Sequence, residues 1–216
     1  MKRKSSFYGA AGLLIAFMLW TAAVCLVDVR PIGPQNSAVG FAILNGLFHD
    51  LTGVNMTLYT VTDWLSLIPF VFVAGFALLG LAQWIKRKSI KNVDRSILIL
   101  GGFYLVVMAA YLLFEVVTVN YRPVLINGVL ETSYPSSTTM LVLCVMPTAI
   151  LQLNDRLHNR VMKHLVGWSL AVFTAFMLIG RTVSGVHWLT DIVGGILLSA
   201  ALVMLYRAAV KSCQKH

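Results

Sequence analysis

Long runs of apolar residues alternate with short basic segments along the whole chain. About 20 apolar residues in a helix cross the hydrocarbon core of a bilayer, so each run predicts a membrane-spanning helix. We expect six spans, at residues 8–27, 64–85, 96–118, 135–153, 165–180 and 188–206. The pattern therefore predicts an all-α membrane bundle of six transmembrane helices that forms one domain over residues 1–216.

The segment between the first two spans, at about residues 28–63, has a helical pattern of its own. Its apolar residues recur at steps of three and four with almost no charge between them, at Phe41, Leu44, Leu47, Phe48 and Leu51. Such an amphipathic helix lies flat in the membrane interface. We expect it on the outer face, where it either helps a lipid tail to enter the protein or is a plain covering loop.

Composition and charge agree with a membrane protein and give it an orientation. Of the 216 residues, 58% are hydrophobic and 12% are charged, whereas about 25% are charged in soluble domains. All 17 Lys and Arg residues except Arg30, Arg122 and Arg181 fall at the ends or loops of one side. Cytoplasmic loops carry this excess, so both termini should be cytoplasmic in a multi-pass protein of the cell membrane. The charges are spread over short loops, which argues against binding of nucleic acid.

Polar residues at the outer ends of the spans are the candidates for chemistry. His187 and Asp191 lie four residues apart and share one helix face, so the aspartate can accept a hydrogen bond from one imidazole nitrogen and leave the other as a nucleophile. Arg122, Arg181 and the helix N-terminus at 133–138 suit an anion. Together these groups predict a phosphoryl site. No metal-ligand spacing is present, and we expect neither a metal nor a cofactor.

Three stretches of sequence resemble the motifs of a known family. They read EVVTVNYRP at 115–123, PSST at 135–138 and GRTVSGVHWLTD at 180–191. The type 2 phosphatidic acid phosphatase superfamily has the motifs K-xxxxxx-RP, PSGH and SR-xxxxx-H-xxx-D in the same order. The resemblance implies an integral-membrane enzyme that removes phosphate from lipid phosphates through a phosphohistidine intermediate.

The resemblance also implies a role for each matching residue. His187 would be the nucleophile and Asp191 the residue that orients it. The phosphate would be held by five residues, namely Arg122, Arg181, Ser136, Ser137 and Thr138.

The chain departs from the family motifs at three positions. Glu115 replaces the lysine, Thr138 replaces the middle histidine, and Gly180 replaces the serine. The resemblance assigns protonation of the leaving oxygen to that histidine, an effect typically worth about 10²–10⁴ in rate. Its loss favours a pyrophosphate leaving group, whereas the added carboxylate disfavours a highly charged headgroup. Glu115 either supplies the proton itself or forms an ion pair with Arg122 or Arg181.

The sequence thus predicts a lipid phosphate or pyrophosphate phosphatase that acts at the outer membrane face. The alternative is a catalytically impaired relative that binds or transports a lipid phosphate. A transporter for a soluble solute fits less well, because transporters usually bind near the midplane and these polar residues gather at one face.

The orientation is testable with reporter fusions. A reporter enzyme that is active only outside the cytoplasm should be inactive after residue 90 or residue 160 and active near residue 128, because Lys and Arg are retained on the cytoplasmic side. Measured activity at residue 90 would reverse the orientation and move the phosphoryl site to the cytoplasmic face.

Overall fold

The computed structural model describes residues 2–213, with side chains from residue 6 onward. Over these residues the protein is helical and contains no β-strand. Six helical stretches are long and apolar enough to cross a membrane, at Ser6–Leu26, Met56–Arg87, Arg95–Val116, Ser137–Arg156, Arg160–Val183 and Leu189–Cys213. The all-α class and the six spans expected from the sequence are confirmed.

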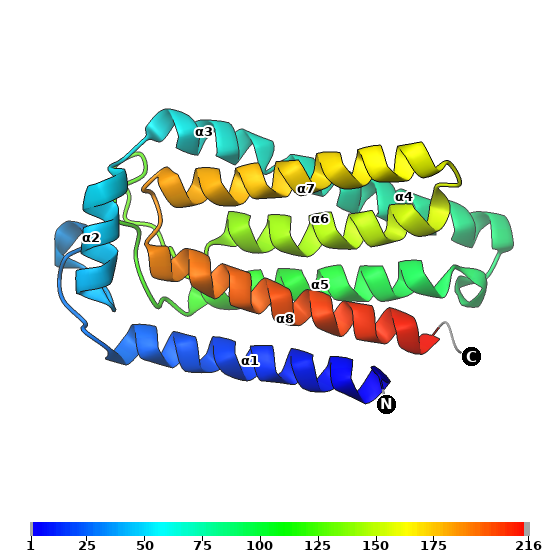
Figure 1. Ribbon diagram of the computed structural model, residues 1–216, viewed down its shortest axis with the longest axis horizontal. Coiled ribbons are helices and arrows are strands. Elements are labelled where there is room, and N and C mark those ends of the chain that lie inside the picture. The colour runs from blue at the N-terminus through cyan, green and yellow to red at the C-terminus, as the bar shows by residue number, and fades with distance from the viewer. Residues whose placement is uncertain (1, 214–216) are drawn as a thin grey trace.

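The long helices run side by side, and both ends of the chain lie at the same end of the bundle (Figure 1). We call this the termini end and the opposite one the α2 end. The long helices are α1 (Lys2–Leu26), α4 (Ile68–Arg87), α5 (Arg95–Val116), α6 (Ser137–Arg156), α7 (Arg160–Val183) and α8 (Leu189–Cys213). The apolar run at 165–180 is only the middle of α7, because the charged residues at both of its ends are helical too.

The segment after α1 forms two short helices instead of one. They are α2 (Ala42–Thr52), which lies across the end of the bundle, and α3 (Met56–Leu65), which leads into α4 (Figure 1). Gly53 ends α2 with a φ of 60°, a conformation that glycine adopts readily. Asn55 then caps α3 by accepting a hydrogen bond from the backbone N–H of Leu58 at 2.9 Å.

Helix α2 has one exposed and one buried side. Leu47 and Leu51 are 66% and 83% exposed, on the side away from the bundle. Asn45 is fully buried, and its side chain donates to the carbonyl of Gly40 and the hydroxyl of Thr190 at 2.8 and 2.9 Å. These bonds fix α2 to the beginning of α8.

Helices α6 and α8 form the centre of the bundle. In each of these two spans, 56% of the apolar stretch is buried, whereas 22% or less of the corresponding stretch is buried in the other four spans. Small residues allow the close approach: a Cβ at Gly194 would lie 2.6 Å from the ring of Tyr134, and a Cβ at Gly195 would lie 3.2 Å from Thr139. The segment that precedes α6 is therefore held directly against the first turns of α8.

Candidate functional site

A tight turn between α7 and α8 presents the central histidine. Gly185 has a φ of 68°, and a Cβ built on it would lie 1.8 Å from the carbonyl oxygen of Gly53. The backbone N–H of Asn55 donates to the carbonyl of Ser184 at 2.9 Å. This contact locks the turn against the α2–α3 junction and leaves the His187 side chain 3% exposed.

A serine bridges the histidine and the aspartate. Ser133 Oγ lies 2.9 Å from His187 Nδ1 and 2.5 Å from Asp191 Oδ2. The single hydroxyl proton goes to the carboxylate, which only accepts, so the oxygen accepts from Nδ1–H. We expected Asp191 to accept directly from the imidazole; instead, the hydroxyl of Ser133 lies between the two side chains and transmits the same preference for a proton on Nδ1.

Asp191 is fully buried and its carboxylate has further donors. Asn120 Nδ2 donates to Oδ1 at 3.0 Å, and the backbone N–H of Trp188 donates to Oδ2 at 3.1 Å. A buried carboxylate is stable only with such partners. Asn120 and Ser133 come from the segment between α5 and α6, so this segment is fixed to α8 through the carboxylate.

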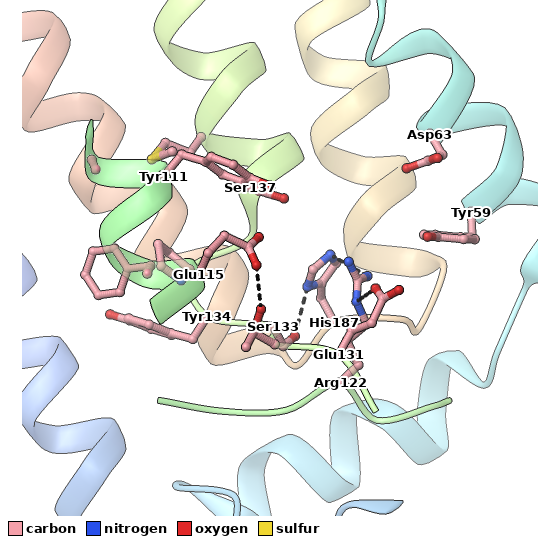
Figure 2. A pocket seen from close by; sticks show the side chains of 15 residues that line it. Tyr59, Asp63, Tyr111, Glu115, Arg122, Glu131, Ser133, Tyr134, Ser137 and His187 are labelled. Carbon is pink, nitrogen blue, oxygen red and sulfur yellow. Dashed lines mark hydrogen bonds and ion pairs between the residues drawn. The ribbon is translucent and has the colours of Figure 1, made fainter. Parts of the chain in front are cut away.

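The second nitrogen of the imidazole, Nε2, contacts an arginine. Arg122 Nη1 lies 3.2 Å from His187 Nε2 (Figure 2), and with the proton on Nδ1 the Nε2 lone pair is the acceptor. Arg122 Nε lies 3.0 Å from Glu131 Oε2 as an ion pair that lacks the alignment of a hydrogen bond. The guanidinium of Arg122 thus lies beside Nε2, and the carboxylate of Glu131 lies beside that guanidinium.

Arg181 lies deeper and has different partners. It is 2% exposed, and its Nη2 donates to Thr138 Oγ1 at 2.8 Å and lies 3.4 Å from Asp63 Oδ1. Its guanidinium carbon is 4.8 Å from the centre of the Tyr59 ring. Arg181 therefore joins α7 to α3 and α6. Its Nε has no hydrogen-bond partner among the residues that the structure describes.

A cavity of about 520 Å³ opens beside these groups (Figure 2). Of the residues predicted for the site, Glu115, Arg122, Ser137 and His187 line it. The other predicted site residues, namely Asp191, Arg181, Ser136 and Thr138, are buried and do not line it. Half of the predicted site residues thus face the cavity, and the other half are buried behind its wall.

Two of the predicted roles look different in the structure. Ser136 is fully buried: its hydroxyl accepts from Thr139 at 3.0 Å, and its backbone N–H donates to the carbonyl of Asp191 at 3.1 Å. Glu115 accepts from Thr132 at 3.4 Å. The structure does not show the ion pair between Glu115 and an arginine, because Arg122 pairs with Glu131 and Arg181 pairs with Asp63.

Sequence reasoning missed several polar residues that contact the predicted ones, among them Asn120, Ser133, Glu131, Tyr59 and Asp63. Asn120 and Ser133 lie within or beside the first and second motif stretches, and that adjacency was the available signal. Glu131, Tyr59 and Asp63 follow no motif and reach the site only through the fold. The described residues include no group of three or more His, Cys, Asp and Glu that could hold a metal ion.

The environment of His187 favours the neutral ring. Burial lowers the pKa of His187 well below its usual value, and the positive charges of Arg122 and Arg181 lower it further. A neutral imidazole with its proton on Nδ1 has a lone pair on Nε2. The arrangement can therefore use this nitrogen as a nucleophile or base and the arginine beside it to hold an anion.

Known proteins resemble this chain in part of its sequence and in its fold. Residues 116–215 match the family model described as the PAP2 superfamily. The fold is similar to the crystal structure of a transmembrane PAP2-type phosphatidylglycerolphosphate phosphatase from Bacillus subtilis, with a TM-score of 0.61 and 20% sequence identity. The similarity covers 95% of this chain and 97% of that one. No curated protein is a significant match.

The lowered pKa of His187 predicts a pH effect on stability. The unfolded chain takes up a proton on this residue below about pH 6.5, whereas the native ring stays neutral. The free energy of unfolding should therefore decrease as the pH is lowered below about 6.5, with a loss of up to about 1.4 kcal/mol at about pH 5.5. Between about pH 7.5 and about pH 5.5, the melting temperature in detergent should decrease more for the wild type than for His187→Gln.

The exposed His158 provides the matched control. His158→Gln should follow the wild-type pH dependence, because it leaves the buried His187 in place. A His187→Gln variant that loses as much stability as the wild type would show that the native ring is protonated as readily as the unfolded one.

Proposed function

Because the chain belongs to the PAP2 superfamily, we propose that it hydrolyses a lipid phosphate through a phosphohistidine intermediate on His187. The observation that supports this best is the bridge from Asp191 through Ser133 to Nδ1. It leaves Nε2 unprotonated beside Arg122 in the wall of the cavity.

In the first step, the Nε2 lone pair attacks phosphorus and the bond between phosphorus and the lipid oxygen breaks. The ring gains positive charge, which the hydrogen bond from Nδ1–H through Ser133 to the Asp191 carboxylate stabilises. Arg122 holds the phosphoryl oxygens, on which negative charge is spread in the transition state. Arg181, which is fixed by Asp63 and Thr138, adds positive potential from behind.

In the second step, water attacks the phosphohistidine, the phosphorus–nitrogen bond breaks and inorganic phosphate leaves. The group that gave its proton to the lipid oxygen in the first step takes one from water in the second. The enzyme is thereby restored with both proton transfers balanced.

The proton donor must be one of the carboxyl groups in the cavity wall. Thr138, at the position of the family's histidine, accepts from Arg181 and does not line the cavity. Asp63, Glu115 and Glu131 line it. We assign the role to Glu115. Glu131 and Asp63 form ion pairs with Arg122 and Arg181, and a carboxylate in an ion pair has no proton to donate, whereas Glu115 accepts a hydrogen bond from Thr132.

A phosphomonoester lipid fits the charges of the cavity better than a pyrophosphate. Glu115, Glu131 and Asp63 line it together with Arg122, so the wall itself carries more carboxylates than cations. A pyrophosphate brings additional negative charge against these groups, and like charges repel strongly where water is scarce. The phosphatidylglycerolphosphate phosphatase with a similar fold makes such a monoester the first substrate to test.

An apolar cavity next to the site supports a lipid substrate. It has a volume of about 380 Å³, extends between α4, α5 and α6, and shares Asp63, Tyr111, Ser137 and Met140 with the site cavity. Phe70, Val107 and Leu141 are among its walls. A lipid held by its phosphate at His187 can place its tail there. The basic loops at the termini end support an outer-face location for this reaction.

Turnover is the decisive test. Purified protein in detergent should release inorganic phosphate from phosphatidylglycerol phosphate in the presence of EDTA, measured by a phosphate assay. His187→Gln should lower the rate by about 10⁴-fold or more, because it removes the nucleophile. Acid quenching of the wild type should also trap an acid-labile phosphohistidine that the variant lacks.

Ser133→Ala serves as a graded comparison. It should lower the rate by about 10- to 100-fold, as is typical when a group that orients a reactive residue is lost, and Ser133→Thr should restore part of it. Wild-type protein that binds the lipid but releases nothing from monoester or pyrophosphate lipids would favour the alternative of a relative that binds or transports lipid phosphates.

Glutamine variants should identify the proton donor. Glu115→Gln should slow monoester hydrolysis by about 10²-fold and pyrophosphate hydrolysis much less, because a phosphate leaves without a proton more easily than an alkoxide. Glu131→Gln is the matched control in the same cavity and should change both rates similarly and modestly. The reverse ranking of the two variants would transfer the role to Glu131.

A further inference from the structure

A second cavity lies between α1, α6 and α8 and extends from the termini end toward the middle of the bundle. Its volume is about 450 Å³, and it shares no lining residue with the cavity at His187. The proposed reaction does not use it. Its shape and charge therefore point to a separate ligand.

One face of α8 forms the main wall of this groove. Ile196, Ala200, Val203, Arg207 and Lys211 line it at steps of three and four residues, so they form one stripe along the helix. The stripe is apolar in the middle of the bundle and cationic at the termini end. An anionic lipid has the same division into an apolar tail and a charged head.

The length of the stripe also matches a lipid. The rise from Ile196 to Arg207 is about 16 Å at 1.5 Å per residue, close to half of the 30 Å hydrocarbon core. Arg207 therefore lies near headgroup depth when Ile196 lies near the bilayer centre. Leu13 of α1 and Leu143 of α6 complete the apolar walls.

The two cations of the groove have no opposing charge in it. Arg207 and Lys211 form no ion pair with any carboxylate among the described residues, and the described lining contains no Asp or Glu. A phosphate group is the complement that both side chains lack. A soluble anion would leave the apolar stripe unused, and a neutral lipid would leave the cations unused.

We propose that this groove is a binding site for an anionic phospholipid of the leaflet at the termini end. The headgroup phosphate contacts Arg207 and Lys211, and one acyl chain lies along Val203, Ala200 and Ile196. Basic pockets between membrane helices are a recognised way to bind such lipids. The site is independent of the proposed hydrolysis at His187.

Native mass spectrometry of the full chain can test the site. The detergent-solubilised protein is mixed with equal amounts of dioleoylphosphatidylglycerol and dioleoylphosphatidylcholine. The adduct with phosphatidylglycerol should dominate by about tenfold, as expected for two cations at headgroup depth. In the double variant Arg207→Gln/Lys211→Gln this preference should disappear, and because both side chains are exposed, folding is unaffected.

The double variant Lys86→Gln/Lys91→Gln is the matched control, because it removes two exposed cations at the same end of the bundle, from α4 and from the connection between α4 and α5. It should keep the preference; an equal loss would reduce the effect to general surface charge and overturn the site. Ala200→Trp, which fills the stripe but keeps both cations, should lower retention of the lipid.

Arg122→Gln separates this groove from the His187 site. The variant removes the cation that lines the His187 cavity and should leave the phosphatidylglycerol adduct in place. Loss of the adduct in Arg122→Gln would place the lipid at the His187 cavity and refute the groove.

Discussion

The buried carboxylate of Asp191 is the constraint on which the candidate site depends. A charge with no access to water is tolerated only if donors surround it, and here they come from Asn120, Ser133 and the backbone of Trp188. Two of these belong to an irregular segment that has little secondary structure to fix it. The need to satisfy one carboxylate therefore orders the segment that carries Arg122 and brings it to His187.

The close contact between α6 and α8 is the second part of this arrangement. Gly194 and Gly195 let Tyr134 and Thr139 lie directly on α8, which brings Ser133 within hydrogen-bond distance of both His187 and Asp191. Packing and polar bonding thus act on the same few residues. Without the glycines, the segment before α6 would stand away from α8 and the bridge could not form.

The sequence predicted those features that have a local or periodic signal. Apolar run length located the six spans, and the spacing of the third motif stretch indicated that His187 and Asp191 act together. The two do not share a helix face, because His187 lies in the turn before α8 and only Asp191 is in the helix. Ser133 was out of reach because its role depends on how two distant segments meet. Glu131 was missed for the same reason: a loop carboxylate has no periodicity, and only the fold brings it to Arg122.

The glycine contact between the α7–α8 turn and the α2–α3 junction couples the position of His187 to that of α2. A Cβ at Gly185 would overlap the carbonyl of Gly53, so no gap remains in which one segment can shift without the other. Helix α2 presents Leu47 and Leu51 outward. A displacement of α2 would therefore be passed on to the turn that carries the His187 ring.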